Sequence, residues 1–163
     1  MAPNTKPPAA PPKPASGATP PKPASGAANP ILASVTIAEL AGALIATFEG
    51  ERLTAYRDSG GVLTIGFGHT GKDVTEGRVI THAQAVFLLQ QDAAPLFQLV
   101  AHLPVAHAAA LVSFGYNCGR SRMEAVLAGH DTIANPVHTT DRQGHVLPGL
   151  VARRRLEETL SAL

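Results

Sequence analysis

The sequence predicts an α+β fold that is mainly helical and carries one small β-hairpin. Apolar residues recur at helical spacing through most of the chain after residue 36. Residues 50–71 break this pattern, because they are rich in glycine and hold two strand-like runs. Residues 1–30 have a third composition, dominated by Pro, Ala, Lys, Gly and Ser. The 163 residues therefore predict a disordered tail or linker over residues 1–30 and one folded domain over residues 31–163.

The tail contains a repeated octet, Pro-Pro-Lys-Pro-Ala-Ser-Gly-Ala, which begins at Pro11 and again at Pro20. Such a segment buries too little apolar surface to offset the entropy lost on ordering. We expect an extended, partly polyproline-II spacer in preference to a ligand for a Pro-binding domain.

Charge and cysteine content exclude several function classes for the folded domain. Residues 31–163 hold ten basic and twelve acidic side chains, and acids follow the one basic run, Arg153–Arg155, so nucleic-acid binding is not predicted. Cys118 is the single cysteine, which leaves no intrachain disulfide. Five His and Asp side chains between residues 130 and 145 lack the spacing of a known ligand set, so no metal site is predicted.

Targeting and membrane segments are not predicted either. Met1 is not followed by the charged start and apolar core of a signal peptide. The most apolar stretch, Ile31–Phe48, is interrupted by Ser34, Thr36, Glu39 and Thr47, which argues against a membrane span.

The first helix is predicted over Ile37–Glu49. Thr36 and Glu39 have the Thr-x-x-Glu spacing of a capping box. One apolar face follows at helical spacing, formed by Ile37, Leu40, Ala41, Leu44, Ile45 and Phe48. Packing of this face would hold Glu49 at the negative end of the helix, where a carboxyl group keeps its proton more readily, as a general acid must.

A hairpin follows, with strands near Thr54–Arg57 and Val62–Phe67. Asp58 opens the turn between the strands, and Thr64 lies in the second strand, six residues later. A helix end followed by a hairpin can bring these two side chains and Glu49 around one cleft. Two carboxylates in unlike surroundings, with a hydroxyl that can hold a water, suit hydrolysis of a glycosidic bond.

The rest of the chain predicts a third short strand or turn and several helices. Thr81 and Gln84 form a second capping box, and Pro95 is expected to break or restart the helix that they open. The third strand or turn is predicted around Lys72–Ile80, and the later helices over Val105–Phe114, Arg120–Ala128 and Leu150–Leu160.

Three motifs in this order resemble those of a known family. Eight residues separate Glu49 from Asp58, five separate Asp58 from Thr64, and Thr-Ile-Gly-Phe-Gly-His begins at Thr64. Residues 111–119 read Leu-Val-Ser-Phe-Gly-Tyr-Asn-Cys-Gly, and residues 149–154 read Gly-Leu-Val-Ala-Arg-Arg, with Glu157 following. The chain thus resembles the phage-type lysozymes, the endolysins of glycoside hydrolase family 24, over roughly residues 36–160. It departs from them over residues 129–148, where relatives usually have a Trp or another large aromatic residue, because it has no Trp.

The resemblance implies a lysozyme-like fold with a small hairpin lobe, a larger helical lobe and a cleft between them. It also implies a muramidase that cuts the β-1,4 bond between N-acetylmuramic acid and N-acetylglucosamine without a cofactor. Glu49 would be the general acid, while Asp58 and Thr64 would hold the attacking water. The predicted supporting or substrate-binding residues are His69, His107, Asn117, Arg153 and Arg154. An arginine beside Glu49 would lower the pKa of its carboxyl group, whereas the negative end of the helix would raise it. The direction of the net shift in the pKa of Glu49 therefore stays open.

The implied partner is bacterial peptidoglycan, with no nucleic acid and no stable membrane insertion. Such an enzyme would be a monomer, made in the bacterial host cytoplasm and active at the cell wall or periplasm. Without a signal peptide it needs another export route, which in this family is usually a holin.

Two alternatives stay open. A lytic transglycosylase would use one acid and form an anhydro-sugar, and the presence of Asp58 and Thr64 counts against it. A non-catalytic or virion-associated peptidoglycan-binding relative would be consistent with the atypical residues 129–148. Stereochemistry is open too: carboxyl groups roughly 6.5–9.5 Å apart permit direct attack by water and inversion, whereas about 5 Å permits a nucleophilic Asp58 and retention.

Overall fold

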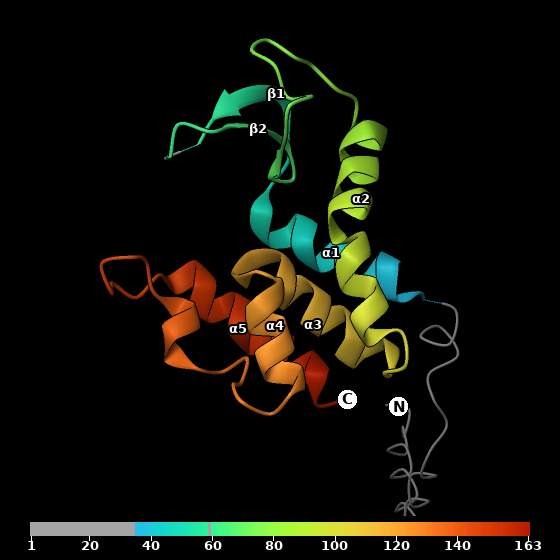
Figure 1. Ribbon diagram of the computed structural model, residues 1–163, viewed down its shortest axis with the longest axis vertical. Helices are drawn as coiled ribbons and strands as arrows, with labels where there is room; N and C mark the ends of the chain where they lie inside the picture. The colour runs from blue at the N-terminus through green and yellow to red at the C-terminus, as the bar shows by residue number, and fades with distance from the viewer. Residues whose placement is uncertain (1–34, 59) are drawn as a thin grey trace, which may run out of the picture.

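The computed structural model describes residues 35–58 and 60–163, so the predicted tail lies outside the described residues. The elements in chain order are α1 (Ile37–Glu49), β1 (Arg52–Arg57), β2 (Leu63–Gly66), β3 (His69–Thr70), α2 (His82–Val100), α3 (Val105–Cys118), α4 (Arg120–Leu127), the 3₁₀ helix η2 (Pro136–Thr139) and α5 (Pro148–Ser161). Figure 1 shows the sheet at one end, helices α3, α4 and α5 at the other, and α2 extending between them. The prediction of a mainly helical, two-lobed α+β fold is confirmed.

Helix α1 begins with the predicted capping box. The Thr36 hydroxyl accepts a hydrogen bond from the Glu39 amide at 3.2 Å, and the Glu39 carboxylate accepts one from the Thr36 amide at 2.8 Å. Ala41, Leu44 and Ile45 are buried. Gly50 follows with a φ of 71°, a left-handed conformation that ends the helix directly after Glu49.

The sheet is antiparallel, with strand order β1-β2-β3. Thr64 in the central strand pairs with Tyr56 on one side and with Thr70 on the other. The third strand is His69–Thr70, and of the two alternatives predicted around Lys72–Ile80, a strand or a turn, the structure shows turns. That segment turns instead of extending, because the Val74 amide bonds back to the Gly71 carbonyl and the Arg78 amide to Thr75.

Helix α2 passes through Pro95 without ending, contrary to the prediction of a break. Pro95 faces solvent, where water can satisfy the carbonyl that loses its helical partner. The opposite face buries Ala93, Leu96 and Val100, and this burial holds the helix together across the proline.

Helix α3 is the centre of the helical lobe and packs against α1, α2, α4 and α5. All residues from Ala108 to Gly115 are buried. Gly115 permits the close approach of α4, since a Cβ there would lie 2.6 Å from the sulfur of Met123. Gly119, with a φ of 91°, ends α3 and precedes α4. In the described part of the chain, no helix has both the length and the hydrophobicity needed to span a bilayer.

Candidate active site

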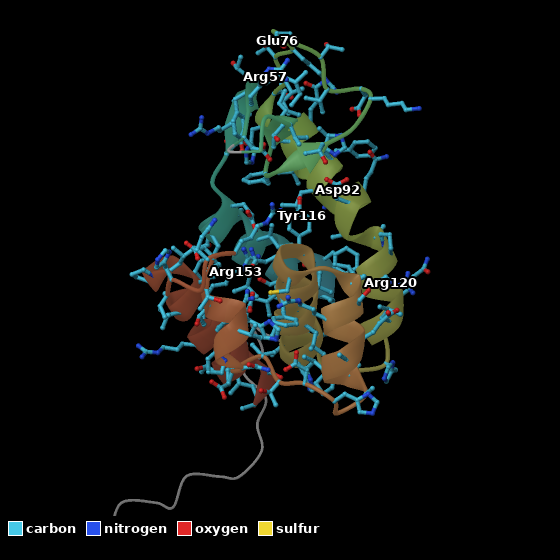
Figure 2. All side chains as sticks on the ribbon, turned by 60° about the vertical axis from the view of Figure 1, so that its left-hand side comes forward. Arg57, Glu76, Asp92, Tyr116, Arg120 and Arg153 are labelled. Atoms are coloured by element: carbon cyan, nitrogen blue, oxygen red, sulfur yellow. The ribbon has the colours of Figure 1, made fainter. Side chains whose placement is uncertain are left out.

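Glu49 lines a pocket of about 260 Å³ at the end of α1, where α1 meets α3 and α5. Phe48, Asn117, Leu150 and Arg153 line the same pocket. The α1 helix end supplies Glu49, the C-terminal end of α3 supplies Asn117, and α5 supplies Arg153. Figure 2 shows Tyr116 at the end of the helical lobe nearest the sheet, with Arg153 below it in the same lobe. Three of the predicted site residues, Glu49, Asn117 and Arg153, therefore come together from distant parts of the chain.

Arg153 of α5 forms an ion pair with the Glu49 carboxylate. One of its Nη atoms lies 2.5 Å from Glu49 Oε1, and the other donates to the Ser113 carbonyl at 3.0 Å. Its Nε donates to Glu157 at 3.1 Å. The Arg153 side chain is 3% exposed and that of Glu49 is 26% exposed, so the acid reaches solvent from a buried support.

The side chains of Asp58 and Thr64 both form hydrogen bonds with the backbone of Val62 in the hairpin. Asp58 Oδ1 accepts hydrogen bonds from the amides of Gly60 and Val62, each at 2.8 Å. The Thr64 hydroxyl donates to the Val62 carbonyl at 3.1 Å. Asp58 is exposed, whereas Thr64 is 4% exposed. Val62 therefore binds both side chains through its backbone, and neither Asp58 nor Thr64 lines the pocket that holds Glu49.

His69 joins the sheet to α2. Its Nδ1 lies 2.9 Å from Asp92 Oδ2, and its Nε2 lies 3.3 Å from Asp73. Burial lowers the pKa of His69, but the hydrogen bonds and charges of the two aspartates outweigh it, so the pKa is raised above its ordinary value. These contacts join the sheet to α2, and the supporting role of His69 stays a prediction.

Two predicted site residues lie away from Glu49. Arg154 follows Arg153 by one position, which turns it about 100° around the helix. It contacts the buried Glu157 and the sulfur of Cys118 instead of Glu49. His107 is near the start of α3, ten residues before Asn117 and thus about 15 Å away along the axis.

Tyr116 was not identified from the sequence. Its hydroxyl donates to the Phe67 carbonyl at 3.0 Å, which joins α3 to the segment between β2 and β3. Burial, with the charges of Asp92 and Glu49 adding to it, raises the pKa of Tyr116. No local pattern in the sequence indicates such a contact between residues 49 positions apart.

The atypical residues 129–148 are fixed by a buried histidine. His138 is 3% exposed, and its ring packs edge-on against Phe114 with centroids 4.9 Å apart. Its Nε2 lies 2.8 Å from Asp131, and its Nδ1 lies 2.9 Å from Arg122. Through these contacts the His138 imidazole anchors its segment to α3 and α4. Within residues 35–58 and 60–163, no group of three or more His, Cys, Asp or Glu side chains is arranged to hold a metal ion.

Comparison with known proteins agrees with this geometry. The sequence model of the phage lysozyme family matches residues 46–157. The SAR-endolysin of Escherichia phage Mu is 31% identical over 150 residues, covering 77% of this chain and 85% of that protein. The SAR-endolysin of bacteriophage PS34 is 32% identical over 101 residues, covering 59% of this chain and 58% of that protein.

A solved structure, the muramidase domain of SpmX from Asticcacaulis excentricus, is 28% identical with a TM-score of 0.64, covering 78% of this chain and 98% of that domain. The chain spans about half of the length of several curated relatives that it matches, between 46% and 58%. The family match nevertheless covers the helix end, the hairpin, α3 and most of α5. The chain therefore belongs to the phage lysozyme family.

Proposed function

We propose that this protein is a muramidase that hydrolyses the β-1,4 bond between N-acetylmuramic acid and N-acetylglucosamine in bacterial peptidoglycan. The observation that carries the proposal is the Glu49 carboxylate, held by Arg153 at the wall of a pocket that α1, α3 and α5 form. Membership in the phage lysozyme family supports it, as do relatives that are endolysins. A structural neighbour described as a muramidase domain supports the same chemistry.

Glu49 is the general acid in this mechanism. It donates a proton to the glycosidic oxygen of the leaving sugar, and its carboxylate then carries a negative charge. Arg153 is already in contact with that carboxylate and is itself buried, so it stabilises the charge without rearrangement. No cofactor takes part.

Asp58 and Thr64 orient the attacking water. The Thr64 hydroxyl donates its hydrogen bond to the Val62 carbonyl, so its oxygen can only accept a hydrogen bond from the water. Asp58 Oδ1 is taken by two backbone amides, which leaves Oδ2 as the acceptor for the second water proton. A water that donates to both side chains has a lone pair free to attack the anomeric carbon. Asp58 then removes the proton, which gives an inverted product.

Product chemistry tests this proposal. Digestion of purified peptidoglycan should release fragments with reducing N-acetylmuramic acid ends, detected by mass spectrometry after borohydride reduction. NMR during the reaction should show the α-anomer first, as inversion of a β-linkage requires. Anhydro-sugar ends would identify a lytic transglycosylase, and an initial β-anomer would identify Asp58 as a nucleophile. Binding to peptidoglycan without release of fragments would support a non-catalytic relative.

We also propose that the protein acts as a monomer and reaches the wall through a holin lesion. The substrate lies outside the cytoplasmic membrane, so the enzyme must cross it. Expression in cells with and without a co-expressed holin tests the route: lysis should require the holin. Lysis by the protein alone would overturn this export route while leaving the chemistry unaffected.

A further inference from the structure

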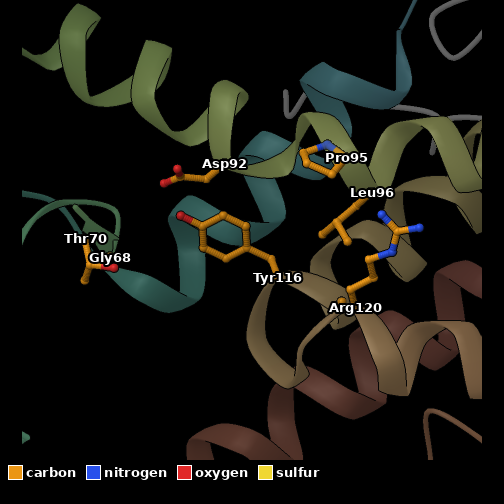
Figure 3. A pocket seen from close by; sticks show the side chains of 8 residues that line it. Gly68, Thr70, Asp92, Pro95, Leu96, Tyr116 and Arg120 are labelled. Carbon is orange, nitrogen blue, oxygen red and sulfur yellow. The ribbon is translucent and has the colours of Figure 1, made fainter. Parts of the chain in front are cut away.

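Helix α2 borders two hollows of the protein surface. Figure 3 shows the first, which Asp92 and Tyr116 line together with Arg120. The second is a groove of about 230 Å³ between α1 and α2. This α1–α2 groove shares no lining residue with the first hollow or with the Glu49 pocket, so the reaction proposed above does not use it.

The walls of the α1–α2 groove are mostly apolar. Helix α2 contributes Val86 and Leu89, helix α1 contributes Ala43 and Ala46, and Phe67 contributes from the segment between β2 and β3. Ala43 is exposed and Val86 is half-buried, so these apolar walls are open to water. Covering them with an apolar group would be favourable, because it would remove apolar surface from water.

The ionisable side chains at the border of the groove already have partners. The Glu39 carboxylate accepts a hydrogen bond from the Thr36 amide at 2.8 Å, and His82 Nδ1 lies 2.7 Å from Glu51 Oε1. A ligand of the α1–α2 groove therefore needs no charged group and is held by burial of its apolar surface.

The segment that precedes α1 has this chemistry. Residues 30–35 read Pro-Ile-Leu-Ala-Ser-Val and carry no charge. Ile31 and Leu32 are the only branched aliphatic residues among residues 1–34, and they stand where the Pro-, Ala- and Lys-rich composition ends. Two large apolar side chains thus occur next to the folded domain and not elsewhere in the tail.

The length of this segment also fits the groove. Residues 31–34 lie outside the described residues, but the half-buried Val35 is described, and Glu39 in the first turn of α1 lines the groove. Along α1 the lining residues run from Glu39 to Ala46, about 10 Å at 1.5 Å per residue. Four extended residues span at most about 14 Å. A chain that turns back at Val35 can therefore reach along the groove.

We propose that Ile31 and Leu32 dock in the α1–α2 groove. Because the segment is tethered to α1, its effective concentration at the groove is higher than that of a free ligand. The docked segment fixes the point at which the Pro-rich tail leaves the domain. It also ties α1, which ends at Glu49, to α2, which extends between the two lobes.

NMR of the full chain with isotope-labelled Ile, Leu and Val methyl groups tests the docking directly. NOEs should connect the methyl groups of Ile31 and Leu32 with those of Val86 and Leu89. A mixture of labelled and unlabelled protein, with isotope-filtered detection, separates contacts within one molecule from contacts between two. Absence of these NOEs overturns the proposal, and NOEs found only between molecules overturn it in favour of a second copy as the occupant.

The substitution Ile31→Ser/Leu32→Ser measures what the docking contributes. It should lower Tm by about 3–5 °C, the shift that loss of a modest apolar contact causes in a domain of this size. Leu163→Ser is the control, because it removes an apolar side chain that is 79% exposed and does not line the groove, so Tm should not change. An equal Tm for the double variant and the wild type overturns the proposal.

A variant that fills the groove separates docking from other effects of the two serines. Ala43→Leu places a larger side chain at an exposed position of the groove wall and should displace the segment. In this background Ile31→Ser/Leu32→Ser should no longer lower Tm, because contacting sites are not additive. Thr47→Leu, one turn further along α1 and outside the lining, should leave the loss intact. The same loss in both backgrounds would place the two apolar residues elsewhere and overturn the proposal.

Discussion

Neutralising Glu157 should destabilise the protein strongly. Glu157 is fully buried, and its Oε1 accepts hydrogen bonds from Ser113 at 2.6 Å and from Arg153 and Arg154 at 3.1 Å each. Its Oε2 lies 2.8 Å from Arg154 Nε, an ion pair that lacks the angles of a hydrogen bond. Glu49 still balances Arg153 in Glu157→Gln, so Arg154 is left as an uncompensated buried cation.

Breaking a buried pair in this way costs about 3–5 kcal/mol, a large part of the roughly 5–15 kcal/mol of stability expected for a domain. Urea denaturation followed by far-UV circular dichroism measures the loss. Glu158→Gln is the matched control, because the neighbouring exposed carboxylate should change stability by less than about 0.5 kcal/mol. A loss below about 1 kcal/mol for Glu157→Gln would refute the view that the buried charges depend on one another.

Three other predictions concern the sheet, the water site and the core. Asp92→Asn removes a partner that raises the pKa of His69. A raised pKa stabilises the folded protein fully below the pKa that His69 has in the unfolded chain, and this stability is lost as the pH rises through the pKa in the folded protein. Asp92→Asn should therefore lower the free energy of unfolding more at pH 5 than at pH 9, as measured by urea titration. Thr64→Val removes the hydroxyl that accepts from the water, so kcat should fall about 10²-fold in a reducing-sugar assay, and Thr64→Ser should recover most of it. Gly115→Ala places a Cβ against Met123 and should cost about 1–3 kcal/mol of unfolding free energy, visible as a lower Tm in calorimetry.

Local signals in the sequence predicted the elements well where the structure depends on neighbouring residues. In each capping box the two partners are three residues apart, Thr36 with Glu39 and Thr81 with Gln84, and both boxes are present in the structure. Pro95 misled the prediction because its effect on the helix depends on burial of the opposite face, which is a tertiary property.

The residues of the candidate site also fall into two groups, those with a signal in the sequence and those without one. Glu49, Asp58 and Thr64 have a motif spacing that the sequence displays, and Arg153 follows from the last motif. Tyr116 and Asp92 have no such signal, since their partners Phe67 and His69 are far away in the sequence and come close only when the chain folds. His107 lies ten residues before Asn117 on α3, and the rise of the helix separates it from the site.

The most direct test of the catalytic assignment compares Glu49→Gln with Glu51→Gln. Glu51 is two residues away and pairs with His82 at 2.7 Å, so it matches the charge and the neighbourhood without facing the pocket. The assay is the loss of turbidity of Gram-negative cells stripped of their outer membrane, with folding verified by circular dichroism. We predict that Glu49→Gln reduces the rate about 10²–10⁴-fold and that Glu51→Gln stays within about twofold of wild type. Retained lysis by a folded Glu49→Gln variant would contradict the role of Glu49 as the general acid.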